Sequence, residues 1–328
     1  MSRARNLANL LDASGDVVSG ALDNVPASND ASALTTGTLP VDRVPYVGRR
    51  NLIINGAMQV AQRGDYTSAT SAAVSAYYLD RYKTWLSTVT ADIQQTTVSI
   101  NGVTKNAYKI TATSSGTGYI GFFQVIELQN IPVGETVTVS AWVRSNNSYA
   151  RLRTTLNGGT STDSPNTHTG GGDWEKLTFT VDTTGLASNP FAGVVTYDGA
   201  TVPVSSGDYI EFTDFQVEVG SVATPFEHRS YGEELALCQR YYVVLTNCKG
   251  GGCAQGRGTG YSRYYAHSWT LPVEMRTNPD ILQNIGFTSD HTGVRAYHAT
   301  TNQYWASHGN TSALYSYWDG DVKLEAEL

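Results

Sequence analysis

The stretch Asp208-Tyr-Ile-Glu-Phe-Thr-Asp-Phe-Gln-Val-Glu-Val-Gly-Ser-Val-Ala-Thr-Pro-Phe-Glu-His-Arg-Ser-Tyr231 decides how the chain is organised. Apolar and polar residues alternate along its first half, which is typical of a β-strand with one buried face. Ile210 and Phe212 share one face of this strand, but Phe215 falls on the other face. One extra residue therefore interrupts the alternation, and we predict a β-bulge near Thr213–Asp214.

The same stretch predicts a boundary between two β-domains. Gly220 and Pro225 interrupt the strand, because proline cannot continue a hydrogen-bonded ladder. We predict a first β-sandwich over residues 49–229 and a second one over residues 230–328. Glu233–Arg240 is rich in Leu, Ala and Glu and predicts two helical turns at the start of the second domain.

The composition favours an all-β protein. Charged residues make up only 16% of the 328 residues, whereas Gly (32) and Tyr (20) are abundant. The net charge of −7 argues against nucleic-acid binding, which needs a basic surface. No apolar run approaches the roughly 18 residues of a membrane span, so we expect no membrane insertion. The N-terminus lacks the features of a secretory signal, so we expect assembly in a reducing cytoplasm.

The N-terminal segment, residues 1–48, contains too little apolar sequence to form its own core. Its prolines favour an extended backbone, so its apolar residues need neighbours, either copies of the same chain or another protein. The alternative is a disordered tail. The residues that we expect to mediate attachment or trimerisation are Leu7, Leu10, Leu34, Leu39, Pro40, Val44 and Pro45.

Leu34-Thr-Thr-Gly-Thr-Leu-Pro-Val-Asp-Arg-Val-Pro45 resembles the shaft and neck segments of bacteriophage tail fibres. In those proteins similar Gly/Pro patterns recur in intertwined trimers. The resemblance implies a homotrimer that is bound to other virion proteins through residues 1–48.

The following 170 residues or so resemble the jelly-roll sandwich of carbohydrate-binding modules and of related phage virion domains. The motifs that carry this resemblance are Asn51-Leu-Ile-Ile-Asn-Gly56, Val137-Thr-Val-Ser-Ala-Trp-Val-Arg144, Asp173-Trp-Glu-Lys-Leu-Thr-Phe-Thr180 and the closing strand. The first motif, combined with Thr224-Pro-Phe-Glu-His-Arg-Ser-Tyr-Gly-Glu-Glu-Leu-Ala-Leu-Cys-Gln-Arg-Tyr-Tyr242, resembles phage virion proteins in particular. The resemblance implies that Asp214 helps to hold a structural calcium ion, for which oxygen ligands are suited. A solvated carboxylate at the sheet edge is the alternative.

The second domain is rich in aromatic residues. Sugar rings stack on Trp and Tyr, and His can bind their hydroxyl groups. The candidate glycan-binding residues are Tyr297, Tyr304, Trp305, His308, Tyr317 and Trp318. The alternative is that most of these rings fill the sandwich core.

No constellation indicates catalysis. Asp214 and Glu218 are four residues apart on a strand, about 13 Å, which is too far for the carboxylate pair of a glycosidase. Cys248-Lys-Gly-Gly-Gly-Cys253 has no second pair and does not fit the usual zinc spacings. We interpret it as a flexible glycine-rich tip that carries free thiols, although a disulfide at this tip is an alternative.

We therefore expect a non-enzymatic phage virion protein without a cofactor, apart from the calcium ion noted above. The expected role is a homotrimeric tail fibre that contacts host surface glycans with its β-domains. The alternative is a structural head-fibre, decoration or baseplate protein that does not bind a receptor.

Overall fold

The computed structural model describes residues 50–186, 188–253, 263–283, 286–287, 295–310 and 315–327. The chain divides into Met1–Gly48 and Arg49–Leu328. The first unit lies outside the described residues, and with it lie the predicted attachment residues Leu7, Leu10, Leu34, Leu39, Pro40, Val44 and Pro45. No helix within the described residues is long and apolar enough to cross a membrane.

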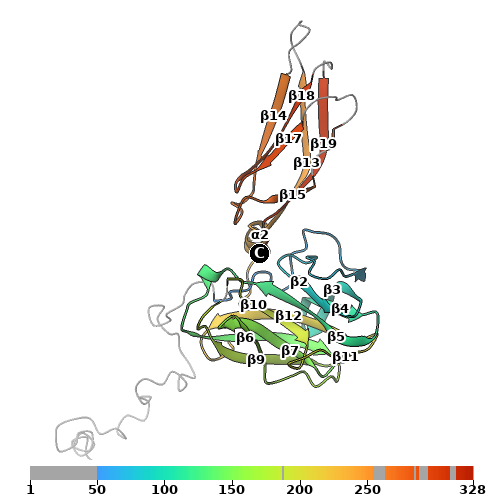
Figure 1. The fold of residues 1–328 in the computed structure, drawn as a ribbon, viewed down its shortest axis with the longest axis vertical. Helices are drawn as coiled ribbons and strands as arrows, with labels where there is room; N and C mark the ends of the chain where they lie inside the picture. Colours follow the sequence, from blue (N-terminus) through green and yellow to red (C-terminus); the bar gives the residue numbers. More distant parts are fainter. Residues whose placement is uncertain are drawn as a thin grey trace, which may run out of the picture. The chain divides into compact units, whose positions relative to one another are not determined.

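Two antiparallel sheets form a β-sandwich in the first half of the second unit (Figure 1). The first sheet has the order β1 (Thr70–Ser71), β3 (Ala91–Ile100), β4 (Val103–Ala112), β12 (Tyr209–Val219), β6 (Thr136–Ser145) and β9 (Trp174–Asp182). The second has the order β11 (Val202–Val204), β5 (Gly116–Val125), β10 (Phe191–Thr196), β7 (Ala150–Asn157) and β8 (Thr160–Asp163), and β2 (Lys83–Ser87) pairs with β5. From β5 onward the chain crosses repeatedly between the sheets, with β7 and β8 and also β10 and β11 as consecutive strands of the second sheet, and this connectivity resembles that of a jelly roll. The all-β prediction is confirmed.

A single hydrophobic core fills the space between the two sheets. Its centre is aromatic. Tyr108 of β4 stacks on Phe122 of β5 with ring centroids 4.0 Å apart, and Phe212 of β12 lies 5.6 Å from Phe122. Rings from opposite sheets thus contact one another directly, and these contacts join the two sheets.

The predicted bulge in β12 is confirmed. The pairing of β12 with β6 shifts between Thr213 and Gln216, and Asp214 has a positive φ of 50°. Without the bulge, Phe212 and Phe215 would lie on opposite faces. With it, both rings are fully buried in the same core, 5.9 Å apart, so the extra residue corrects the phase of the strand.

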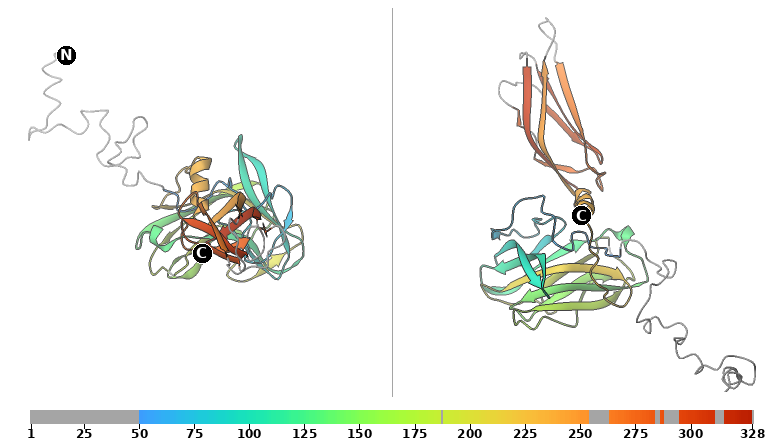
Figure 2. Two further views of the ribbon diagram at one scale, coloured as in Figure 1. Left: turned by 90° about the horizontal axis from the view of Figure 1, so that it is seen from above. Right: turned by 180° about the vertical axis from the view of Figure 1, so that it is seen from behind.

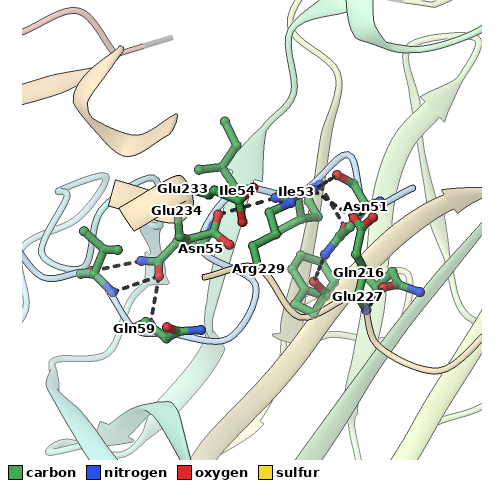
Figure 3. Close-up of polar contacts among 12 residues, drawn as sticks. Asn51, Ile53, Ile54, Asn55, Gln59, Gln216, Glu227, Arg229, Glu233 and Glu234 are labelled. Carbon is green, nitrogen blue, oxygen red and sulfur yellow. Dashed lines mark hydrogen bonds and ion pairs between the residues drawn. The ribbon is translucent and has the colours of Figure 1, made fainter. Parts of the chain in front are cut away.

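The apolar run Asn51–Ile54 predicts a strand at the start of the sandwich, but this prediction is wrong, because these residues form no strand. Side chains from distant parts of the sequence take the place of a neighbouring strand (Figure 3). The backbone N–H groups of Arg50 and Asn51 donate to the Glu227 carboxylate at 3.0 and 2.9 Å. The backbone N–H of Ile54 donates to Gln124 Oε1 at 2.9 Å.

We call the residues Asn51, Asn55, Glu227, Arg229 and Glu234 the polar clasp (Figure 3). The Asn51 amide donates to the Phe215 carbonyl at 3.0 Å and accepts from the Val217 N–H at 3.1 Å, so it bonds to β12 just beyond the bulge.

Asn55 and Arg229 complete the clasp. The backbone N–H of Asn55 donates to Glu234 Oε1 at 2.6 Å. Arg229 donates to the carbonyls of Asn51 and Ile53. Gly56 passes so close to β12 that a Cβ there would lie 2.3 Å from the Phe215 carbonyl oxygen. The motif at residues 51–56 and the first part of the motif at residues 224–242 are therefore the two halves of one contact.

Helix α2 (Tyr231–Gln239) follows the clasp and confirms the helix predicted there. Ser230 caps it: its hydroxyl accepts from the Glu233 N–H at 3.3 Å, and the Glu233 carboxylate accepts from the Ser230 N–H at 3.1 Å. This reciprocal pair is a capping box, which stabilises the first helical turn.

A second β region follows α2 and is coloured orange to red in Figure 1 and Figure 2. One sheet has the order β13 (Tyr242–Cys253), β19 (Tyr315–Glu325) and β15 (Asp280–Gln283), with β16 (Gly286–Phe287) also on β19. The other has the order β14 (Arg263–Thr270), β18 (Gln303–Asn310) and β17 (Arg295–Ala299). This region has its own core, which includes Val243, Tyr304 and Leu324. The domain boundary at residue 229 stays a prediction.

The flexible tip predicted at Cys248–Cys253 is wrong, since β13 runs through all of these residues. The glycines have a continuous antiparallel partner in β19, where Gly250 lies opposite Trp318 and Gly251 opposite Tyr317. A full ladder of backbone hydrogen bonds offsets the low strand propensity of glycine.

Buried ion pairs join the end of β19 to the loops of the sandwich. Arg63 pairs with Glu325 at 2.5 Å and with Glu327 at 2.9 Å, and Arg81 pairs with Glu327. The guanidinium of Arg81 also lies 3.5 Å from the ring centroid of Tyr241. The side chains of Arg63, Arg81 and Glu327 are almost completely buried, so removal of one partner would leave an uncompensated charge.

Asp80 is a buried acid beside these ion pairs and predicts a measurable pH dependence. Burial raises its pKa from 3.8 to about 6, although its carboxylate accepts hydrogen bonds from the Gln62 backbone and side chain at 2.6 and 2.8 Å. A raised carboxyl pKa means that the native state binds more protons than the unfolded state between about pH 4 and pH 6. As the pH rises through that window, the free energy of unfolding should fall by about 3 kcal/mol because of this group.

Urea unfolding at several pH values between 4 and 7.5 measures this effect. The free energy of unfolding of the variant Asp80→Asn should lack this part of the pH dependence, because asparagine has no proton to lose. If the free energy of unfolding depended equally on pH in the native protein and the variant, this would contradict the raised pKa of Asp80.

Candidate functional site

Aromatic side chains cover the outward face of the second sheet. Along β2, β5 and β10, every second residue points away from the core, while its neighbours, such as Leu86, Phe122 and Val194, are buried. The outward positions carry a set of half-buried rings that we call the aromatic face: Trp85, Tyr119, Phe123, Phe191 and Tyr197.

Trp85 lies at the centre of the aromatic face. Its ring centroid is 5.7 Å from that of Tyr119, 5.4 Å from that of Phe123 and 5.1 Å from that of Phe191, and each pair is edge-on. Tyr197 extends the set, 6.1 Å from Tyr119. Edge-to-face packing of this kind holds each ring in one orientation. The face is therefore organised before any ligand arrives.

Two arginines of β7 border the rings. The guanidinium of Arg153 lies 3.8 Å from the centroid of Tyr197 and 5.3 Å from that of Trp85. It pairs with Asp163 at 3.4 Å, and Arg151 pairs with Asp198 at 2.7 Å. Charged donors and acceptors thus lie directly beside the apolar surface, which is the usual composition of a ligand site.

Two glycines, Gly121 and Gly193, lie beneath the rings where the neighbouring strands approach closely. A Cβ on Gly121 would lie 2.3 Å from the Val194 carbonyl oxygen, and one on Gly193 would lie 2.2 Å from that of Phe122. No side chain fits at either position. Gly193 pairs with Phe123, so no side chain stands opposite the Phe123 ring on the neighbouring strand.

A hollow of about 340 Å³ lies at one end of the aromatic face. It is lined by Ser75, Lys83, Trp85, Phe123, Val125, Asn189 and Phe191. Rings and hydrogen-bonding side chains therefore converge on a space that is large enough for a small ring-shaped group.

The glycan-binding residues predicted in the second β region are not brought together by the described structure. Tyr304 is fully buried and packs against Trp269 with centroids 5.6 Å apart, so its assignment as a glycan-binding residue is wrong. It belongs to the core of that region, because alternation along β18 points it inward. The side chains of the remaining candidates lie outside the described part of the structure: Tyr297 on β17, Trp305 and His308 on β18, and Tyr317 and Trp318 on β19.

Asp214 is nearly buried, with a side chain that is 6% exposed, and it forms an ion pair with Lys105. Among the described residues no group of three or more His, Cys, Asp or Glu side chains is placed to hold a metal ion. The structural calcium at Asp214 stays a prediction, and any such ion would have to share the carboxylate with the lysine.

The two described thiols, Cys238 and Cys248, are free and buried. Burial raises the pKa of both. Neither is therefore suited to act as a nucleophile. The side chain of Cys253 lies outside the described part of the structure.

Sequence reasoning missed the aromatic face because its residues come from strands that are far apart in the sequence. Trp85 and Tyr119 meet only through the pairing of β2 with β5, and Phe191 only through the pairing of β10 with β5. Alternation in Lys83–Ser87 puts Trp85 on the face opposite Leu86, and that was the available signal.

Comparison with known proteins describes the fold alone. No protein-family model matches the chain, and no curated protein does. Among solved structures, the enzymatically active domain of tailspike protein 4 from bacteriophage CBA120 is similar at 12% identity with a TM-score of 0.34, over 52% of this chain and 21% of that one. A carbohydrate-binding module, TmCBM61 in complex with β-1,4-galactotriose, is similar at 15% identity with a TM-score of 0.31, over 52% of this chain and 100% of that one.

The tandem CBM22-1–CBM22-2 domain of Paenibacillus barcinonensis Xyn10C is similar at 9% identity with a TM-score of 0.32, over 81% of this chain and 100% of that one. The chain thus spans about a fifth of the tailspike domain and the whole length of the modules. These values describe a shared arrangement of strands and carry no inference about ligands.

Proposed function

We propose that this chain is a non-enzymatic glycan-binding protein of a bacteriophage particle. We assign glycan binding first to the aromatic face of the sandwich, formed around Trp85. The observation that carries the proposal is the group of half-buried rings beside Arg151 and Arg153.

The chemistry of the aromatic face matches that of a sugar. One face of a pyranose ring presents C–H groups that pack on an aromatic ring, while its hydroxyl groups need hydrogen-bond partners at the rim. Trp85 and Phe191 supply the apolar surface, and Lys83 lines the hollow beside them. Contiguous apolar patches on a soluble protein surface commonly mark binding sites.

The particle role rests on the N-terminal segment. The resemblance of Leu34–Pro45 to tail-fibre segments, and the scarcity of apolar residues before Gly48, support attachment to other virion proteins and assembly as a homotrimer. In this proposal residues 1–48 anchor the chain and the β-regions contact the host surface. The aromatic residues of β17, β18 and β19 are a further proposed contact with host glycans.

Removal of a central ring should weaken glycan binding. For the glycans that the full-length protein captures on an array of bacterial surface saccharides, Trp85→Ala and Phe191→Ala should each raise the Kd at least tenfold, which corresponds to about 1.4 kcal/mol of lost stacking. Trp174→Ala is the matched control, because Trp174 is a half-buried ring on the first sheet, beside Arg144 at 5.2 Å.

Binding should be unchanged in the control and at least tenfold weaker in the two face variants, with the melting temperature of each variant checked in parallel. Particles that carry Trp85→Ala should adsorb poorly to the host. Normal adsorption together with unchanged array binding would instead favour a structural head-fibre, decoration or baseplate protein.

The trimer has a separate test. Size-exclusion chromatography with light scattering on the full chain should give three times the 35.4 kDa of one chain. A double substitution, Leu39→Asp with Val44→Asp, should shift the mass toward that of the monomer, because it places charges on the apolar positions of the extended segment. A native protein that elutes as a folded monomer would contradict the trimer.

A further inference from the structure

A second pair of hollows lies on the outward face of the first sheet, around Asp214. One, of about 240 Å³, is lined by Ala57, Gln59, Thr104, Lys105, Asn106, Asp214 and His228. The other, of about 310 Å³, is lined by Lys105, Ser140, Trp142, Lys176, Asp214, Thr224, Pro225, Phe226 and His228. The two hollows share Lys105, Asp214 and His228, so one set of charged side chains serves both.

The bulge in β12 creates this arrangement. Phe212 and Phe215 are fully buried in the core, and Asp214 between them has a φ of 50°. A positive φ is uncommon for a residue other than glycine and costs free energy. Strained residues of this kind are concentrated at functional sites, where the strain positions a side chain. Here it directs the Asp214 carboxylate outward, into the hollows.

Only one of the two oxygens of the Asp214 carboxylate has a hydrogen-bond partner among the described residues. Its Oδ2 accepts from the Lys105 ammonium, and its side chain is only 6% exposed. Among the described residues, Oδ1 accepts no hydrogen bond. Oδ1 is therefore free to accept a hydrogen bond from a ligand that enters the hollows.

The walls of the site are rigid and partly aromatic. The segment Thr224–His228 crosses the face of the sheet and is held at two points: the Thr224 N–H donates to Glu218 Oε1 at 2.8 Å, and the Glu227 N–H donates to Gln216 Oε1 at 2.8 Å.

Along this segment the rings of Phe226 and His228 pack edge-on at 4.9 Å. Trp142 of β6, which is half-buried, provides a further wall of the second hollow. The site is therefore formed in advance and has an indole surface next to a charged donor–acceptor pair.

This combination of groups suits a polyhydroxyl ligand. Lys105 is already paired with the Asp214 carboxylate, and the Lys176 ammonium lines the second hollow as a further hydrogen-bond donor. Adjacent hydroxyl groups of a sugar offer both functions at once, since one can donate to Asp214 Oδ1 while its neighbour accepts from the Lys105 ammonium. The apolar face of the sugar ring can pack on Trp142.

We infer that Asp214, Lys105 and Trp142 form a second saccharide-binding site, which recognises the vicinal diol of a single sugar unit. The site lies on the opposite sheet from the aromatic face and shares no residue with it. The inference goes beyond the proposed function and does not depend on it. A chain with both sites would bind two saccharide units through one sandwich.

Ligand-observed saturation-transfer NMR on the full-length protein tests the inference, with glucose, galactose, mannose and N-acetylglucosamine as probes. All measurements are made in a Trp85→Ala background, so that the aromatic face does not contribute. At least one of the probes should bind, and binding should weaken at least tenfold on Trp142→Ala.

The double variant Lys105→Met with Asp214→Asn should have the same effect, because it removes both charges together. Asparagine tolerates a positive φ, so the bulge should be retained. Trp174→Ala is the control and should bind as well as the background does. Melting temperatures show that each variant is folded.

Three outcomes would overturn the inference. They are the absence of binding by every probe in the Trp85→Ala background, unchanged binding in both site variants, and binding that disappears when calcium is chelated. The last result would mean that an ion, rather than Lys105, serves as the partner of Asp214. None of these outcomes bears on the aromatic face, whose test is the loss of binding on Trp85→Ala itself.

Discussion

The polar clasp is the interaction on which the rest of the sandwich depends. Asn51 and Asn55 use their amides to bond backbone groups that no neighbouring strand reaches, and Glu227 and Arg229 do the same from the other end of the sandwich sequence. The amides of both asparagines are buried, so each of these bonds also satisfies groups that would otherwise be costly to bury. The network joins the two ends of the sandwich sequence, and such networks favour one arrangement of the chain over its alternatives.

The clasp acts on β12, which in turn organises both outward faces. Asn51 bonds to Phe215 and Val217 just past the bulge, so the phase shift that buries both Phe212 and Phe215 is held from outside the strand. The bulge presents Asp214 on the first sheet. Phe212, one of the two core rings beside the bulge, packs against Phe122 and so supports the strand that presents Tyr119 and Phe123 on the second sheet. One local irregularity therefore contributes to two surfaces.

The features predicted correctly from the sequence are those that depend on local chemistry. The bulge followed from the phase of alternation around Phe212 and Phe215, and α2 from helix-forming residues after Ser230. The errors share a different cause. Asn51–Ile54 has the composition of a strand, yet its backbone bonds to side chains that are distant in the sequence, such as Glu227, which is 176 residues from Asn51. Gly250 and Gly251 lack strand propensity, yet β19 supplies a ladder.

The aromatic face could not be predicted because it depends on register between strands. Composition does not distinguish Tyr304 from Trp85, since each is an aromatic residue within a strand. Only the packing shows that Tyr304 lies in a core and that Trp85 lies on a surface.

The central claim is that the rings around Trp85 hold a saccharide. A crystal structure of the full-length protein with an oligosaccharide that it captures on a glycan array tests this most directly. The account predicts electron density for a sugar ring packed on Trp85 and Phe191, with hydroxyl groups toward Lys83 and the arginines of β7. Density for the sugar elsewhere, with an empty aromatic face or one covered by a neighbouring subunit, would contradict it.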